Sequence, residues 1–357
     1  SAARFMLPYW NPYKSDGSLA SLSDGSWHGQ GQNPLEWLAN NPLKYKKYKL
    51  FSTAFAELTL YKNLVFKSQF GVDFSHTTGF SQSFPEYVPN QGEGSAARSS
   101  SDGLNLQMSN TLTYRFDIDN IHDFNFLLGH ESIISKNQAF GAEVDGLTDT
   151  RLTLMSAGST STVPSHSKTE KVFNSYFATA SYNFAEKYFV DASFRRDGSS
   201  LFGENSKWGS FWSLGAMWDI KKESFLEDVE WLDRLQIKAS YGSVGNSSGL
   251  SPYMAYGLIG SGPMYGGASG TAVANPANPD LTWEIAKSTN IGLNARVFDR
   301  VSLDVDFYNR DVEDMLMEIP YSYTTGFSGG WGNVASMRNR GIDITAAVDI
   351  FKNFNGM

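Results

Sequence analysis

The sequence of 357 residues contains no cysteine. This absence excludes disulfide frameworks, thiolate metal sites and cysteine nucleophiles. Charge is also sparse, because charged residues make up 18% of the chain and the net charge is -8. Nucleic-acid binding rests on clustered lysine and arginine, so no nucleic-acid partner is predicted.

Long apolar runs are missing as well. No window reaches the roughly 18 apolar residues of a transmembrane helix. The start at Ser1 has no charged segment followed by an apolar one, so we expect a signal peptide to be absent or removed. A membrane location stays open, because a barrel strand alternates lipid-facing and lumen-facing residues and its hydropathy averages out.

Aromatic residues and glycine are abundant. Aromatic residues reach 14% and glycine contributes 33 residues, a mixture that suits strands and tight turns. Apolar and polar residues alternate with period two from Leu104 to Ile118, and the same pattern recurs at 235–241, 301–310 and 342–350. About eleven strands are predicted, most of them long enough to cross a bilayer at a tilt, at 48–60, 63–75, 104–118, 122–135, 170–184, 187–198, 207–220, 233–244, 284–298, 300–316 and 334–351.

The connections between these strands alternate in length. Outer-membrane barrels have short periplasmic turns and long extracellular loops. Short links are predicted at 61–63, 119–121, 185–186 and 298–300, with a longer exception at 221–232. Long loops, rich in small and polar residues, are predicted at 76–103, 136–169, 199–206, 245–283 and 317–333. The fold class is therefore all-β, a transmembrane antiparallel β-barrel.

A soluble sandwich or propeller is the structural alternative, since its strands also alternate. Such folds need neither strands of more than ten residues nor alternating short and long links. Aromatic residues near predicted strand ends suit interfacial girdles, namely Tyr182, Phe184, Tyr188, Trp212, Trp218 and Phe298.

Several short segments form an ordered set of motifs along nearly the whole chain. They are Pro8 to Tyr13, Asn41 to Leu43, Tyr188 to Phe202, Lys207 to Gly209, Leu235 to Asn246, Asn278 to Glu284 (NPDLTWE), Thr289 to Leu293 (TNIGL), Phe307 to Asn309, Thr324 to Phe327 and Asn333 to Ile342. Together these segments resemble the SusC/RagA family of TonB-dependent outer-membrane transporters.

This resemblance implies a 22-stranded barrel with a plug, of which the chain supplies about half the wall. By the same implication, residues 1–47 form an extracellular loop region that leads into the barrel. Residues 48–357 form barrel strands with long extracellular loops, and the N-terminal plug is absent from this chain. The implied partners are a SusD-like lipoprotein, the TonB complex acting through the plug, outer-membrane lipid, and a second importer–lid pair in a dimer.

Catalytic and metal chemistry is not predicted. Gly326 to Gly330 matches the G-x-S-x-G elbow of hydrolases, but no helical pattern follows it. The five histidines lack metal-ligand spacing. Carboxylates from Glu143 to Asp149 are chemically able to hold calcium, yet EF-hand spacing is not met, so no cofactor is predicted. Asp304 and Asp306 suit a wet lumen, and Arg195, Arg196 and Asp197 suit structural charge pairing.

Substrate contacts are the hardest residues to assign. Loop aromatics can stack on sugar rings or pack against peptide side chains, and the candidates are Trp27, Trp37, Tyr253, Tyr256, Tyr265 and Trp331. The function predicted is TonB-dependent import of oligosaccharides or peptides across the bacterial outer membrane, without enzymatic activity. A scaffold barrel that transports nothing, a siderophore receptor and an extracellular β-rich enzyme are the alternatives.

Overall fold

The computed structural model describes residues 9–29, 31–85, 93–162 and 164–350. Its elements are α1 (Pro34–Asn40), β1 (Leu43–Tyr61), β2 (Leu64–Ser83), β3 (Gly94–Ile118), β4 (His122–Leu147), η3 (Met155–Ala157), β5 (Thr160–Ser161), β6 (Ser165–Phe184), β7 (Tyr188–Ser199), β8 (Trp208–Asp219), η4 (Ile220–Lys222), β9 (Leu232–Asn246), β10 (Ile259–Tyr265), β11 (Ala268–Val273), β12 (Glu284–Val297), β13 (Val301–Pro320), η5 (Tyr323–Thr325) and β14 (Gly329–Val348). In this part of the chain no helix is long and apolar enough to cross a membrane.

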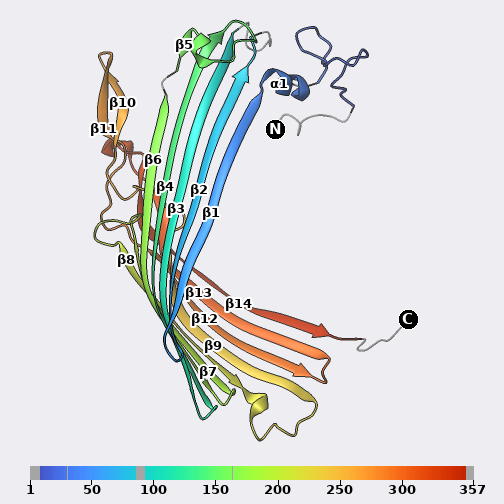
Figure 1. Ribbon diagram of the computed structural model, residues 1–357, viewed down its shortest axis with the longest axis vertical. Helices are drawn as coiled ribbons and strands as arrows, with labels where there is room; N and C mark the ends of the chain where they lie inside the picture. Colours follow the sequence, from blue (N-terminus) through green and yellow to red (C-terminus); the bar gives the residue numbers. More distant parts are fainter. Residues whose placement is uncertain (1–8, 30, 86–92, 163, 351–357) are drawn as a thin grey trace. The chain divides into compact units, whose positions relative to one another are not determined.

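The long strands belong to one sheet (Figure 1). Hydrogen-bonded neighbours follow the order β1-β2-β3-β4-β6-β7-β8-β9-β12-β13-β14, with β5 beside β4. Every pairing from β6 to β14 is antiparallel. Among the described residues this path therefore contains the eleven strands that the sequence predicted, in nearly sequential order.

Several strands continue beyond their predicted ends. Residues 76–103 and 136–169 were predicted as loops, but β2 runs to Ser83, β3 starts at Gly94, β4 runs to Leu147 and β6 starts at Ser165. These extensions carry mostly polar or small residues on both faces, with isolated apolar ones such as Phe80 and Phe140. The two-residue alternation in hydropathy is therefore lost although the backbone pairing continues. The prediction of loops throughout both ranges was wrong for that reason.

Smaller elements were also missed. β1 begins at Leu43, whereas the sequence placed the first strand at 48. The predicted loop 245–283 contains the hairpin β10–β11, which forms a separate two-stranded sheet. Its glycine, serine and alanine residues give no hydrophobic alternation, so periodicity does not detect it.

The predicted short links are tight turns. Asp119 and Asn120 have φ angles of 57° and 54°, Ala185 and Glu186 both have 53°, and Phe298 and Asp299 have 55° and 50°. Two successive residues with positive φ define a type I′ turn, whose twist matches that of antiparallel strands. These turns fix the register of the hairpins β3–β4, β6–β7 and β12–β13.

Aromatic rings cluster beside these turns. The Phe116 and Phe124 centroids lie 4.9 Å apart, Phe124 and Tyr182 4.7 Å, and Tyr188 and Trp218 6.1 Å. The Glu223 carboxylate accepts hydrogen bonds from the Tyr188 hydroxyl, from Trp218 Nε1 and from Lys187. These bonds, that from Tyr188 above all, hold the pKa of Glu223 below its usual range. This arrangement is the one expected of the aromatic layer that barrel strands present at a membrane interface.

The chain divides into two compact units. Unit 1 comprises Ser1–Ser52, Val72–Asn105 and Ser135–Glu170, and unit 2 comprises Thr53–Gly71, Leu106–Ile134 and Lys171–Met357. In unit 1, Asn33 is fully buried and donates to the carbonyls of Pro12 (2.8 Å) and Ala20 (2.7 Å). Its side-chain oxygen accepts from Leu35 N at 3.1 Å and caps α1.

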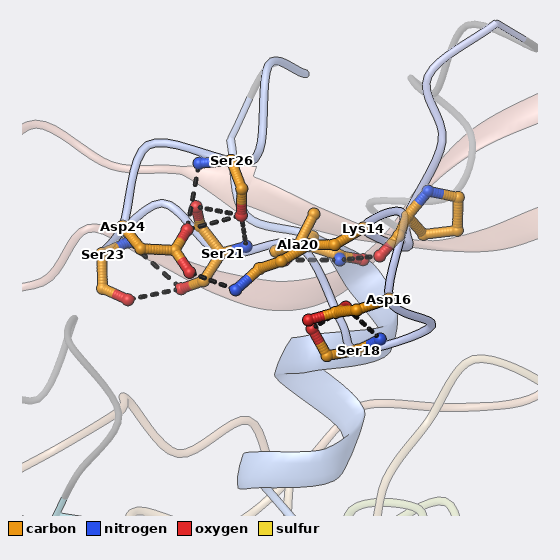
Figure 2. A network of polar contacts seen from close by, with 10 residues as sticks. Lys14, Asp16, Ser18, Ala20, Ser21, Ser23, Asp24 and Ser26 are labelled. Atoms are coloured by element: carbon orange, nitrogen blue, oxygen red, sulfur yellow. Dashed lines mark hydrogen bonds and ion pairs between the residues drawn. The ribbon is translucent and has the colours of Figure 1, made fainter.

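A polar network holds the segment before this helix (Figure 2). Lys14 Nζ contacts the Asp24 carboxylate, which also accepts from Ser26 Oγ at 2.5 Å and Ser26 N at 3.0 Å. Asp16 accepts from Ser18 N at 2.9 Å. Hydrogen bonds from Lys14 and then Ser26 hold the pKa of Asp24 well below its usual range. The segment is thus ordered by polar contacts more than by apolar burial.

Candidate functional site

The predicted substrate-contacting residues fall in both units. In unit 1, Trp27 is only 4% exposed, donates Nε1–H to Gly31 O at 2.9 Å and packs edge-on against Trp10. Trp37 lies on α1 and is 45% exposed. Trp37 therefore presents a ring to solvent, whereas most of the Trp27 ring is already occupied by its own segment.

The other four candidates lie in unit 2. Tyr253 and Tyr256 form a turn, in which Tyr256 N donates to Tyr253 O at 3.0 Å, and both rings are partly exposed. Tyr265 ends β10, and its side chain lies outside the described residues. Trp331 lies on β14 and packs partly against a buried cluster. The described rings therefore lie on separate segments: before α1, on α1, on the turn at 253–256 and on β14.

Trp331 lines a pocket of about 380 Å³. Met254, Leu258 and Pro276 supply apolar walls, while Asn275 and Glu318 supply polar groups. Asn275 is held in place because its amide donates to Tyr256 O at 2.6 Å. An aromatic ring beside an amide and a carboxylate is able to bind either a sugar or a short peptide. Sequence reasoning missed Asn275 and Glu318, since neither belongs to a recognisable motif.

The pocket lies beside a hydrophobic cluster, which we name the loop core. It consists of Leu201, Phe202, Phe211, Leu250, Ala255, Leu281 and Trp283, with Trp331 and Met254 packed against it. The Trp283 ring lies 4.4 Å from that of Phe202 and 5.4 Å from that of Phe211, and its Nε1 donates to Lys207 O at 3.2 Å. The loop core therefore fixes the backbone that carries the pocket.

The NPDLTWE motif holds the loop core together through hydrogen bonds to residues 203–205. Gly203 N donates to Leu281 O at 2.9 Å, and Asn205 N donates to Pro279 O at 3.1 Å. Asn205 also donates its side-chain amide to Asp280 at 2.9 Å. A Cβ on Gly203 would lie 2.1 Å from Pro279 O, so only glycine allows the two segments to approach this closely. The motif is thus structural.

A second motif residue completes the attachment. Asn333 accepts from Thr282 N at 3.0 Å and donates back to Thr282 O at 2.9 Å. Its amide also donates to Asp314 O at 2.7 Å. Asp314 has a φ of 55° and lies where the β13–β14 register shifts, which marks a β-bulge. Asn333 therefore joins the loop core to the bulged end of β13.

The polar face of unit 2 carries a larger hollow of about 650 Å³. Its charged lining groups are Asp191, Lys238, Asp306 and Asp343, with Asn290 and Tyr308 among the neutral ones. Lys238 Nζ lies 2.8 Å from Asp306 across β12. Gly292 is the register partner of both residues, and a Cβ there would lie 2.1 Å from Lys238 Cε. The ion pair therefore depends on glycine in the TNIGL segment.

A second cluster occupies the same face. The Phe177 ring covers Gly129, where a Cβ would meet it at 2.2 Å, and the Arg195 guanidinium lies 5.2 Å from the ring centroid. Arg195 pairs with Asp197 at 2.6 Å and with Glu131 at 3.1 Å. Phe177 therefore fills the space above a glycine while Arg195 joins three strands. Structural charge pairing is confirmed for Arg195 and Asp197. Arg196, predicted with them, instead lies 5.7 Å from the Trp208 ring centroid.

Asp304 and Asp306 lie on one face, as predicted for a wet lumen. Asp304 accepts from Asn294, and Asp306 pairs with Lys238. Asn294 and Lys238 were not foreseen as their partners, because alternation gives the face of a residue but not the register between strands. In unit 1, a smaller hollow of about 270 Å³ lies between Tyr45 and Glu143.

The segment that matches the hydrolase elbow leads into a strand. Ser328, the serine of the elbow-like segment, is followed by β14 and not by a helix, and its carbonyl accepts from Tyr321 N at 3.0 Å. That geometry does not raise a nucleophile above a sheet. Across the described ranges, no group of three or more His, Asp or Glu residues is arranged to hold a metal ion.

Comparisons with known proteins agree with this architecture. The family model described as TonB dependent receptor-like, beta-barrel, matches residues 4–356. TonB-dependent receptor P26 of Formosa agariphila is 27% identical over 352 residues, which cover 94% of this chain and 35% of that protein. TonB-dependent receptor SusC of Bacteroides thetaiotaomicron is 28% identical over 185 residues, which cover 50% of this chain and 18% of SusC.

A solved structure is similar as well. The structure of the RagAB peptide transporter superposes with a TM-score of 0.87 and 32% identity, covering 98% of this chain and 39% of that chain. The chain thus spans little more than a third of the length of the relatives that it matches from end to end.

Proposed function

Because the chain belongs to the TonB-dependent receptor family, whose barrel model matches residues 4–356, we propose that it forms part of the wall of an importer for oligosaccharides or peptides. The predicted transmembrane barrel and the bacterial outer-membrane location are confirmed by the family match and by the likeness to SusC and RagAB. The transported substrate, the partners and the transport activity itself are the proposal.

The charged face of unit 2 is the main support for the proposal that the chain forms part of an importer's wall. Barrel strands turn one face to lipid and the other to the lumen. The face with Asp191, Lys238, Asp306 and Asp343 holds charges that a lipid-facing surface does not tolerate. A wet, charged wall suits the passage of polar solutes. We propose no bond-making or bond-breaking step and no resident cofactor.

The loop core and its pocket support the choice of substrate class. Two of the similar proteins are the TonB-dependent receptor SusC and the RagAB peptide transporter. The pocket at Trp331 combines a ring, an amide and a carboxylate, a set suited to both ligand classes. We propose that ligand reaches this end of the barrel from a SusD-like lipoprotein, that TonB drives passage through a plug, and that importer–lid pairs associate as dimers.

Growth of a deletion strain on defined carbon and nitrogen sources tests the proposal. We expect growth to fail on one oligosaccharide or peptide source and to return on complementation. Trp331→Ala should weaken uptake about threefold to tenfold, the contribution of one aromatic contact. Trp231→Ala is the matched control, because that ring is 54% exposed and contacts Phe298 beside a short turn. Equal growth of the deletion strain on every source would count against import.

Affinity purification separates import from the scaffold alternative. A copurifying lipoprotein lid that holds a bound sugar or peptide supports import. Other surface proteins without a small ligand favour a scaffold role. Expression that rises under iron limitation would favour a siderophore receptor instead.

A further inference from the structure

On the outward face of unit 1, apolar residues give way to ionisable ones over two residues of each strand. In β1, β2 and β3, the even-numbered residues Leu50, Phe74 and Leu104 share a face, and Leu50 and Phe74 are 57% and 37% exposed. The next residues on that face are Tyr48, His76 and Asp102. Tyr48 stacks on His76 at 6.5 Å, and His76 Nδ1 lies 2.6 Å from Asp102. An apolar row thus borders an ionisable row.

Cations lie on this face both beyond the ionisable row and level with it, since Lys168 lies between His166, which contacts Gln138, and Glu170, which pairs with Lys136. We name Lys44, Lys46, Arg98 and Lys168 the basic patch; they lie on β1, β3 and β6, and all four are exposed. Arg98 lies 4.1 Å from the Phe80 ring centroid, which confirms the common face of β2 and β3. Within the described residues these four cations form no ion pair, whereas Lys136 nearby pairs with Glu170 at 3.4 Å. In the part of the chain that the structure describes, no carboxylate pairs with this patch, although the net charge of the whole sequence is -8.

The opposite face of the same strands carries the odd-numbered residues. It is the inward face, because along β3 the same parity includes Gln107, which donates to Glu131, the partner of Arg195 on the polar face. Tyr45, Gly79 and Ser99 meet there, since a Cβ on Gly79 would lie 2.4 Å from Ser99 Oγ and 3.0 Å from Tyr45. Side chains alternate along a strand, so Lys44 and Lys46 point away from this face while Lys47 and Lys49 point toward it. A solute on the inward face therefore does not reach the side chains of Lys44 and Lys46.

We propose that the basic patch binds the phosphate groups of a glycolipid in the outer leaflet, with the acyl chains lying on the apolar row. The patch lies on the side of the apolar row away from the short turns, the end that faces outward in such barrels. Lysine and arginine attract phosphate, and lysine stems lie along apolar surface while the charge stays in water. This site rests on the proposed orientation of the barrel in the outer membrane, and it does not require that the protein transports a solute.

Matched double variants on one strand test the proposal. In the intact protein, Lys44→Gln/Lys46→Gln removes two outward charges, and Lys47→Gln/Lys49→Gln removes two inward ones. Purified protein in detergent is titrated with diphosphoryl lipid A, and bound lipid is counted by native mass spectrometry. Each outward charge is worth about fivefold in affinity near an anionic lipid surface. We therefore expect about twentyfold weaker binding for the outward pair and under twofold for the inward pair.

Three further arms decide the source of the recognition. Lys44→Arg/Lys46→Arg should bind as the unchanged protein does, because the charge is kept. Dephosphorylated lipid A with the same acyl chains should bind as weakly to the unchanged protein as phosphorylated lipid binds to the outward variant. Binding should also weaken at higher salt.

Equal losses in the outward and inward variants would overturn the proposal. So would equal binding of dephosphorylated lipid. Full competition by millimolar inorganic phosphate would show a phosphate site without a lipid, and would overturn the lipid assignment.

Discussion

Gly203→Ala should open the loop core while leaving the strands intact. The new Cβ would lie 2.1 Å from Pro279 O and 2.3 Å from Pro279 C, both backbone atoms that no rotamer change can move away. The two segments must separate by about 1 Å to restore ordinary contact. The φ of Gly203 is not in the left-handed region, so lack of space is the whole effect.

The magnitude follows from the contacts that are lost. Separation weakens the hydrogen bonds from Gly203 N to Leu281 O and from Asn205 N to Pro279 O. Each contributes about 1 kcal/mol, and crowding of a packed interior costs about 1–3 kcal/mol. We expect a local cost of about 3 kcal/mol, which raises the open population roughly a hundredfold.

Hydrogen exchange measured by mass spectrometry checks this expectation. Peptides covering 200–206 and 278–284 should exchange roughly a hundredfold faster, while β7 and β8 keep their protection. Gly257→Ala is the control, because its nearest neighbour is Ala277 Cβ at 3.5 Å, an ordinary contact. Unchanged exchange in a folded Gly203→Ala protein would refute the argument that the close approach fixes the loop core.

Three other outcomes follow from local geometry. Ala185→Asn should stabilise the β6–β7 turn by about 0.5–1 kcal/mol, because asparagine tolerates the positive φ of 53°; denaturant unfolding in lipid vesicles measures it, and a loss of stability would contradict it. Gly292→Ala should displace the Lys238–Asp306 pair at a cost below about 1 kcal/mol, since exposed pairs contribute little; its effect should shrink in a Lys238→Ala background, and additive effects would argue against it. The hydrogen bond from Lys14 is the largest cause that lowers the pKa of Asp24 from its ordinary value of 3.8. The ionised carboxylate therefore stabilises the folded segment above pH 3.8, and this stabilisation is lost as the pH falls toward the lowered pKa of the folded state. Hydrogen bonds from Ser18 lower the pKa of Asp16, which acts in the same direction. Corrected exchange protection of residues 18–27 should therefore fall below pH 4, and Asp24→Asn should remove part of that pH dependence; an unaltered pH profile in that variant would exclude the mechanism.

The sheet was predictable because membrane strands keep a strict alternation of faces. Leu104 to Ile118 reads as one strand from its residues alone, and the turn at Ala185 and Glu186 was located by the break between two alternations. The C-terminal ends of β2 and β4 were not predictable. Residues 76–83 and 136–147 are mostly polar or small on both faces, so only backbone pairing identifies them as strand. Fold class and central strands therefore follow from local pattern.

The candidate site was less predictable for a related reason. Trp331 was chosen as a loop aromatic, but it lies on β14. It does line a pocket, in which Glu318 comes from the neighbouring strand and Asn275 from a distant loop. Their convergence depends on the register of β13 and β14 and on the bulge at Asp314. No periodicity encodes such a meeting. The assignment of substrate contacts to the six aromatic residues stays a prediction.

The loop core also constrains motion at this end of the wall. Residues 201–205, 278–283 and 333 are joined by backbone and amide hydrogen bonds, so the segments between β7 and β8 and between β9 and β12 move together or not at all. The hairpin β10–β11 pairs within itself in a separate sheet. We therefore expect movement at this end to concentrate in the hairpin, whose strand pairing lies within its own sheet, while the joined residues keep their relative positions.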